Sequence, residues 1–191
     1  MLLYTRERLL AHLQDTGSLI DLYQHRDPRF SERVVAWLGD LEQSLAQLRL
    51  PLVALVAAER GRILAAADGY RESAVGGERL STRRVTLAVA SLALDRVQNE
   101  VRRVIADIDA KFDTWREKMA QFLAIATTKA PIPLPPTEPR DAWLATVWAG
   151  LNVNGEVQGM YRYLGAALRP TDRLHLLDEV IGNLLDSLPP P

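Results

Sequence analysis

Apolar residues recur through the segment from Glu78 to Lys129 at alternating steps of three and four, the spacing of a coiled-coil helix. The segment contains neither glycine nor proline. Its apolar stripe comprises Leu87, Ala90, Leu94, Val97, Val101, Val104 and Ile108 and, after one extra step of four, Phe112, Trp115, Met119, Phe122 and Ala126. Because charged residues occupy the other faces, the pattern predicts one long amphipathic helix.

The preceding segment has the same spacing, which predicts a second long helical arm. Asp27 followed by Pro28 is a typical helix start, with a capping side chain and a proline at the first helical position. The apolar stripe then runs through Val34, Leu38, Leu41, Leu45, Leu48, Leu52 and Leu55. Because Pro51 interrupts this stripe and cannot donate a helical hydrogen bond, we expect a kink or short break near Leu50, with both halves facing the same partner.

Glycine and proline mark the boundaries between the other predicted elements. Gly76 and Gly77 predict a chain reversal that pairs residues 29–73 with residues 81–129 as an antiparallel hairpin. A short N-terminal helical element, interrupted at residues 15–18, precedes this hairpin. Prolines concentrated in residues 130–139 predict an extended linker, and three short helices follow.

These elements predict an all-α fold, a helical bundle built on a long, coiled-coil-like antiparallel hairpin. Residues 1–129 would form the N-terminal helices and the hairpin. Residues 130–140 would form the proline-rich linker, and residues 141–191 a C-terminal helical cluster that packs on the hairpin as one unit.

The long helix has more apolar surface than one antiparallel partner can cover. Outside its main stripe it carries Val85, Val89, Leu92, Ala93, Ile105 and Leu123. A helix with so wide an apolar face needs several neighbours. We expect the terminal helices to cover part of this surface and a second copy of the chain to cover the rest, which predicts a homodimer.

Composition excludes several functional classes. The 191-residue chain contains no cysteine, which excludes disulfides, thiolate metal ligands and cysteine nucleophiles. Its net charge of −1 gives no overall field that would attract nucleic acid or anionic lipid. No apolar run has the length of a membrane span, and the first residues do not form a secretory signal. We therefore expect a cytoplasmic protein, and its abundant arginine and alanine are typical of GC-rich bacterial genomes.

Residues suited to metal or acid–base chemistry are scattered along the chain. Asp21 and His25 share a helical face, but they form only half of a metal site. Two arginine–histidine pairs, Arg6 with His12 and Arg169 with His175, have a ribonuclease-like spacing, but the polar residue expected after the arginine is absent in both, and Pro170 separates Arg169 from the helix of His175. We predict no catalytic residue, no metal and no cofactor.

Aromatic residues gather in the C-terminal part of the chain. The group comprises Trp143, Trp148, Tyr161, Arg162 and Tyr163. Rings with polar ends are typical of interfaces and ligand pockets, so we predict a surface for a partner or ligand here. A small local core that packs on the hairpin explains the same residues without a ligand.

The predicted tip of the hairpin is rich in arginine. Arg79, Arg83 and Arg84 lie next to the two glycines, at the start of the long helix, where they could contact an anion. The acidic residues Glu72 and Glu78 oppose this charge, so a simple solvated tip is the alternative.

The pattern leads to the hypothesis of a non-enzymatic helical scaffold or adaptor that pairs with itself and with another protein. Two alternatives stay open. One is a helical regulator that holds a small apolar ligand near Trp143, Trp148 and Tyr161. The other is a helical nucleic-acid-binding protein or ribonuclease that uses the arginine-rich tip together with Arg169 and His175.

Overall fold

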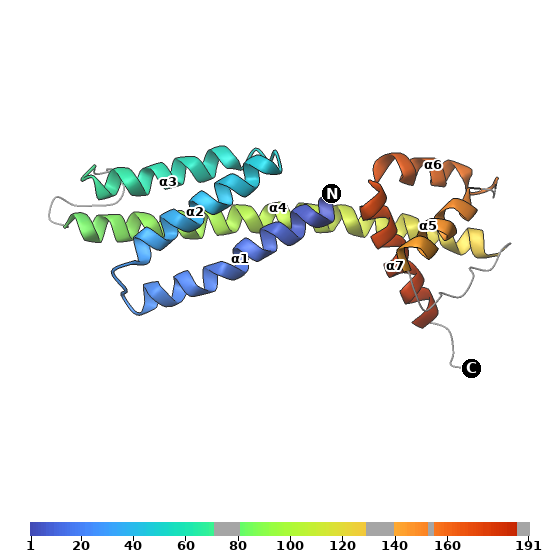
Figure 1. Ribbon diagram of the computed structural model, residues 1–191, viewed down its shortest axis with the longest axis horizontal. Helices are drawn as coiled ribbons and strands as arrows, with labels where there is room; N and C mark the ends of the chain where they lie inside the picture. Colours follow the sequence, from blue (N-terminus) through green and yellow to red (C-terminus); the bar gives the residue numbers. More distant parts are fainter. Residues whose placement is uncertain (71–80, 129–139, 153–154, 187–191) are drawn as a thin grey trace. The chain divides into compact units, whose positions relative to one another are not determined.

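The structure, a computed structural model, describes residues 1–70, 81–128, 140–152 and 155–186. Over these ranges the regular elements are all helices, so the predicted all-α fold is confirmed (Figure 1). The helices are α1 (Leu2–Gln24), α2 (Phe30–Gln47), α3 (Val53–Ala67), α4 (Thr82–Thr127), α5 (Arg140–Leu151), α6 (Gln158–Ala167) and α7 (Pro170–Asp186). The predicted reversal at Gly76 and Gly77 and the linker at residues 130–139 lie outside the described residues.

The chain divides into two compact units. The N-terminal unit consists of Tyr4–Ala106, and the C-terminal unit consists of Asp107–Pro191 together with Met1–Leu3. The division falls inside α4, so the two halves of this helix belong to different units.

The core of the N-terminal unit is formed by α1, α2, α3 and the first half of α4. The part of α4 in this core buries most of its apolar stripe and most of the apolar residues outside that stripe. The buried residues of this part are Val85, Val89, Ala90, Ala93, Leu94, Val97, Val101 and Ile105. Helices of the same chain therefore cover most of the apolar excess predicted for α4, while Leu92 stays exposed.

The break predicted near Leu50 is present, and it is a complete chain reversal. Arg60 of α3 donates a 2.9 Å hydrogen bond to Glu42 of α2, which places the two helices side by side (Figure 1). The arm predicted as one kinked helix is therefore two helices that fold back on each other around Pro51. A proline permits either outcome, because it removes one helical hydrogen bond in both cases.

The interruption predicted at residues 15–18 of the first helix is wrong, since α1 is continuous from Leu2 to Gln24. Thr16 and Ser18 donate their hydroxyl hydrogens to the backbone carbonyls of Leu13 and Asp15, three residues earlier. Such bonds satisfy these hydroxyls within the helix.

The C-terminal unit contains the second half of α4 together with α5, α6 and α7, at the places where the three short helices were predicted. Arg116 of α4 donates a 2.8 Å hydrogen bond to Glu179 of α7, and Arg140 of α5 donates one of 2.6 Å to Asp178. The buried side chains from α4 are Ile108, Phe112, Met119, Phe122, Leu123 and Ala126. The predicted stripe of α4 thus continues into a second core.

None of the described helices combines the length and the hydropathy that crossing a membrane would require.

Candidate functional site

The aromatic residues singled out by the sequence meet inside the C-terminal unit. The ring of Tyr161 stacks on the indole of Trp148, with 4.6 Å between ring centroids and 22° between planes. Phe122 of α4 approaches the same indole at 5.8 Å, and the Arg173 guanidinium lies 4.6 Å from its centroid. Because side chains from three other helices pack on the buried Trp148 of α5, its ring acts as a packing centre for this unit.

The other predicted residues of this surface lie in different environments. Trp143 is buried, and its Nε1 has no hydrogen-bond partner among the described residues. Tyr163 is exposed; its hydroxyl accepts a 3.0 Å hydrogen bond from the Lys118 ammonium, which also lies 4.4 Å from the ring centroid. Arg162 is exposed beside it. The structure therefore brings Trp148 and Tyr161 together and leaves Arg162 and Tyr163 on the outside.

The predicted anion contact is only partly within the described residues. Arg83 and Arg84 are exposed in the first turn of α4, and Arg79 lies outside the described ranges. Neither Arg83 nor Arg84 forms an ion pair within the described part of the chain. Their side chains are free to contact an anion, but no described group fixes their positions.

Among the residues that the structure describes, histidine and carboxylate side chains do not assemble an accessible site. Nδ1 of His25 forms a 2.8 Å hydrogen bond with the backbone carbonyl of Asp21. The two residues predicted as half of a metal site are therefore linked through the backbone of Asp21 and not through its carboxylate. Across the described ranges, no group of three histidine or carboxylate side chains is placed to hold a metal ion. Arg169 and His175 are both exposed at the start of α7.

One buried polar contact was missed by the sequence analysis. Nε2 of His12 and the hydroxyl of Ser44 lie 2.8 Å apart, and the indole N–H of Trp37 donates a 3.0 Å hydrogen bond to the carbonyl of His12. A histidine beside a serine hydroxyl is the arrangement of nucleophilic catalysis. His12 and Ser44 are only 9% and 3% exposed, however, so a substrate cannot reach them. The contact instead joins α1 to α2.

The environment of His12 lowers its pKa. Burial is the largest cause, and the positive charge of Arg8 adds to it, against smaller opposing effects of Asp15 and Asp40. A neutral imidazole is therefore favoured in the folded chain. The sequence did contain a signal that His12 is buried. The buried positions of α1 alternate at steps of four and three, and His12 and other polar residues occupy some of them. They are Thr5, Leu9, His12, Thr16 and Leu19.

Two buried carboxylates bind several donors each. Glu59 of α3 is 3% exposed and accepts hydrogen bonds from Arg62 at 2.9 Å and from Arg96 of α4 at 2.8 Å. Asp172 of α7 accepts from the backbone N–H groups of Leu2 and Leu3 at 3.0 and 3.1 Å, and from the terminal ammonium. Burial, the largest single effect on Asp172, raises its pKa, but these donors together outweigh it and lower the pKa. Both carboxylates are structural links between helices.

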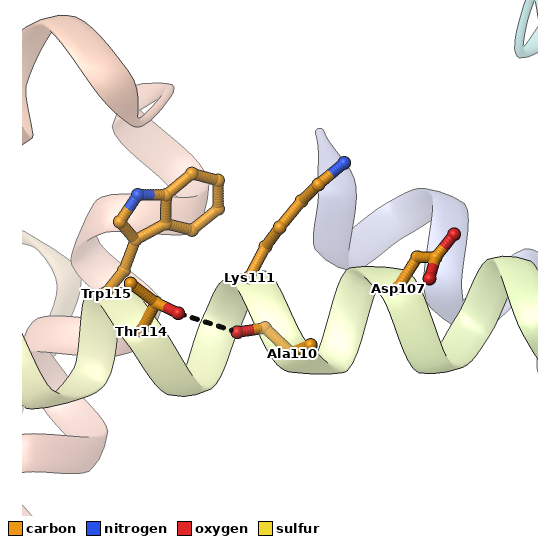
Figure 2. Close-up of a pocket in the computed structure, with 5 residues that line it drawn as sticks. All are labelled: Asp107, Ala110, Lys111, Thr114 and Trp115. Atoms are coloured by element: carbon orange, nitrogen blue, oxygen red, sulfur yellow. Dashed lines mark hydrogen bonds between the residues drawn. The ribbon is translucent and has the colours of Figure 1, made fainter.

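A surface hollow of about 390 Å³ lies along α4 in the C-terminal unit. Figure 2 shows Lys111 and Trp115 projecting from the same side of the helix, with Asp107 one turn before Lys111. Thr114 donates its hydroxyl hydrogen to the carbonyl of Ala110 at 3.0 Å. Because all the described lining residues belong to one helix, the part of the chain that the structure describes gives the hollow no second wall that could enclose a ligand.

No protein-family model, curated protein or solved structure matches this chain.

A second hollow, of about 280 Å³, lies between α3 and α4 in the N-terminal unit. The α3 side contributes small residues and Arg62, the α4 side contributes Val89, and Tyr70 lies beside them with 68% of its surface exposed. The lining residues are Ala58, Gly61, Arg62, Ala65, Ala66, Tyr70 and Val89. This hollow has two helical walls and a mostly apolar lining.

The hollow adjoins an unusual helix surface, which we name the α3 face. It consists of all the exposed residues of α3, namely Ala54, Ala58, Gly61, Leu64 and Ala67. None of them is charged or polar, and Leu64 is 44% exposed. The exposed residues of α2, by contrast, include Glu32, Arg33, Asp40, Gln43 and Gln47. The α3 face therefore has less polar covering than is normal for a surface helix, since only Arg60 and Arg62 flank it with charge.

Proposed function

We propose that the protein is a non-enzymatic helical scaffold or adaptor that binds another polypeptide through the α3 face. The observation that carries the proposal is that the most exposed residues of α3 are apolar or glycine, while the half-exposed Arg60 and Arg62 on this helix are held by carboxylates of the same chain. A surface helix of a globular protein normally places polar residues on the side away from the core. A partner chain on this face would complete the burial of α3.

The neighbouring surface supports the same function. Leu92, on the adjoining helix α4, is 56% exposed and follows Val89 of the hollow by three residues, so both lie on one side of α4. Tyr70 lines the same hollow. Apolar and aromatic residues gathered around a groove are typical of helix-binding surfaces, where an incoming helix inserts its apolar side chains.

The alternatives have less support from the described residues. A small apolar ligand beside Trp148 would have to displace the side chains of Tyr161, Arg173 or Phe122 that pack on its ring. The paired His12 and Ser44 are buried, which does not favour catalysis there. The α3 face needs no such rearrangement, because it is already exposed.

Site-specific photocrosslinking in the cells that naturally make the protein tests the proposal. A benzophenone side chain in place of Leu64 should give protein adducts, whereas the same group in place of Ala36, an exposed alanine on the polar surface of α2, should not. Ala58→Glu, which places a charge on the face, should abolish the adduct at position 64. Absence of any protein adduct at position 64, or equal yields at both positions, would contradict the proposed function.

A further inference from the structure

We infer that the polypeptide bound on the α3 face is a second copy of this chain, with the two α3 helices antiparallel around a two-fold axis at Gly61. The inference rests on the proposed function, because it names the partner of the same face. It makes the protein a homodimer whose interface lies in the N-terminal unit.

The sizes of the side chains fit this arrangement. In an antiparallel pair centred on Gly61, positions equally far from the axis face each other. Ala58 of one copy then lies opposite Leu64 of the other, and Leu64 opposite Ala58. A large residue thus meets a small one on both sides of the axis, as interdigitating helices require. Ala58 also lines the hollow, which gives Leu64 of the second copy a place to pack.

Gly61 fits a position at the axis. A Cβ added there would meet no atom of the chain within 4 Å, so the fold of one copy does not require glycine at this position. Glycine inside a helix is less favourable than alanine, because it loses more backbone freedom on folding. At a two-fold axis, a residue faces its own copy. A glycine at this position lets the two helix backbones approach closely.

The charges around the face allow self-association. A two-fold interface brings identical residues together, so a charged face would repel its own copy. The residues of the α3 face carry no charge, and Arg60 and Arg62, which flank Gly61 and would face each other across the axis, are each paired with a carboxylate of their own chain. Arg60 bonds Glu42 and Arg62 bonds Glu59, each at 2.9 Å. The pairing of two copies therefore leaves no arginine without its carboxylate.

The size of the face sets the strength of the expected dimer. The 15 residues of α3 span about 22 Å, at about 1.5 Å per residue. One helix face of this length provides roughly half of the ~800 Å² per partner of a standard stable interface. Leu92 and Tyr70 add apolar area at its edge. We therefore expect a dimer that dissociates on dilution.

Sedimentation velocity of the full chain, from micromolar to near-millimolar concentration, measures this equilibrium. The wild type should shift from monomer to dimer across the range. Gly61→Leu should weaken the dimer at least tenfold, because a leucine on each copy separates the helices at the axis. Gly17→Leu is the matched control, since Gly17 is also an exposed helical glycine with no atom within 4 Å of an added Cβ. It should leave the dimer unchanged, and circular dichroism should show both variants folded.

Because the chain contains no cysteine, single cysteines can test the antiparallel arrangement. Gly61→Cys should form a disulfide-linked dimer on mild oxidation, and Gly17→Cys should not. An equimolar mixture of Ala58→Cys and Leu64→Cys should give the mixed dimer in excess over either homodimer. Crosslinking at position 17 as efficient as at position 61 would overturn the arrangement.

The two proposals fail in different ways. A wild-type chain that stays monomeric up to near-millimolar concentration overturns the second-copy inference. If the benzophenone at position 64 then gives an adduct with a different polypeptide, the interaction function stands without the homodimer. If it gives no adduct at all, both proposals are wrong.

Discussion

Two arginines end helices in a backbone conformation that favours glycine. Arg26 follows α1 and Arg49 follows α2, and both have a φ of 55°. After Arg49, the N–H of Leu50 donates to the carbonyl of Leu45 at 3.0 Å, which closes the turn between α2 and α3. Gly69, with a φ of 93°, occupies the equivalent position after α3. The left-handed region crowds a Cβ against the backbone, so the arginines make these turns at a cost.

Replacement of Arg49 by glycine should stabilise the protein. Removal of the Cβ relieves the crowding in the left-handed conformation, and this gain exceeds the loss from the greater freedom of glycine in the unfolded chain. We therefore expect the free energy of unfolding to rise by about 0.5–1 kcal/mol. The reverse exchange, Gly69→Ala, should lower it by about 1 kcal/mol. Urea denaturation followed by circular dichroism measures both changes. A loss of stability in Arg49→Gly would show that the arginine side chain contributes more than its backbone conformation costs.

His12 should make stability depend on pH near neutrality. Its pKa in the folded chain is lowered from 6.5, first by burial and then by Arg8, so the unfolded chain binds a proton more readily. The free energy of unfolding should therefore fall as the pH drops below about 6.5. His12→Gln keeps an amide nitrogen for Ser44 and does not titrate. The difference in stability between wild type and this variant should change between about pH 7.5 and about pH 5.5, and a constant difference would contradict the assignment.

At the residue scale, the sequence predicted some local features of the fold and not others. Pro51 correctly predicted a break in the helix, but the residue that makes the reversal is Arg49, whose type carries no turn signal. The Trp148–Tyr161 stack lies within the group that composition singled out, although spacing alone could not tell that the Trp148 ring is enclosed. The contact of His12 with Ser44 joins two helices, so neither local pattern predicts it.

At the scale of elements, α4 shows how a periodic pattern encodes more than a helix. The length and apolar stripe predicted for it are present in the structure. The one irregular point is the extra step of four from Ile108 to Phe112, and the division between the units falls close by, between Ala106 and Asp107. Such an irregular step changes the face that a stripe presents. The change of neighbours along α4 could therefore have been read from this step.

Glu59 should contribute more to the pairing of α3 and α4 than either arginine that it binds. Glu59→Ala removes the shared acceptor, and we expect a loss of about 1–3 kcal/mol in the free energy of unfolding. Arg96→Ala should cost less than about 1 kcal/mol, because the Arg96 side chain is 57% exposed and Arg62 still pairs with the carboxylate. Thermal unfolding of the two variants gives the comparison. Equal losses would indicate that the arginines act as one unit with Glu59.

At the scale of the whole molecule, the two units have separate cores along one helix. Leu41 is fully buried in the N-terminal unit, and Leu177 is fully buried in the C-terminal unit. Removal of a buried leucine side chain typically costs 2–5 kcal/mol in the core that contains it. The two cores share no side chains, so damage to one core need not spread to the other.

Hydrogen exchange measured by mass spectrometry should separate the two units. Leu41→Ala should reduce protection in α2 and leave α7 unchanged, whereas Leu177→Ala should reduce protection in α7 and leave α2 unchanged. Loss of protection in both helices from either substitution would show that the chain unfolds as one cooperative unit.

The hydrogen bonds from Leu2 and Leu3 to Asp172 affect the order in which the chain can fold during its synthesis. The N-terminal unit needs only the chain up to Ala106, so it can form while the remainder is still being translated. Asp172 is added 66 residues later (172 − 106), which takes about 3–13 s at the ~5–20 residues per second of synthesis. The backbone N–H groups of Leu2 and Leu3, made before the N-terminal unit, must therefore wait until α7 is synthesised before they find their acceptor.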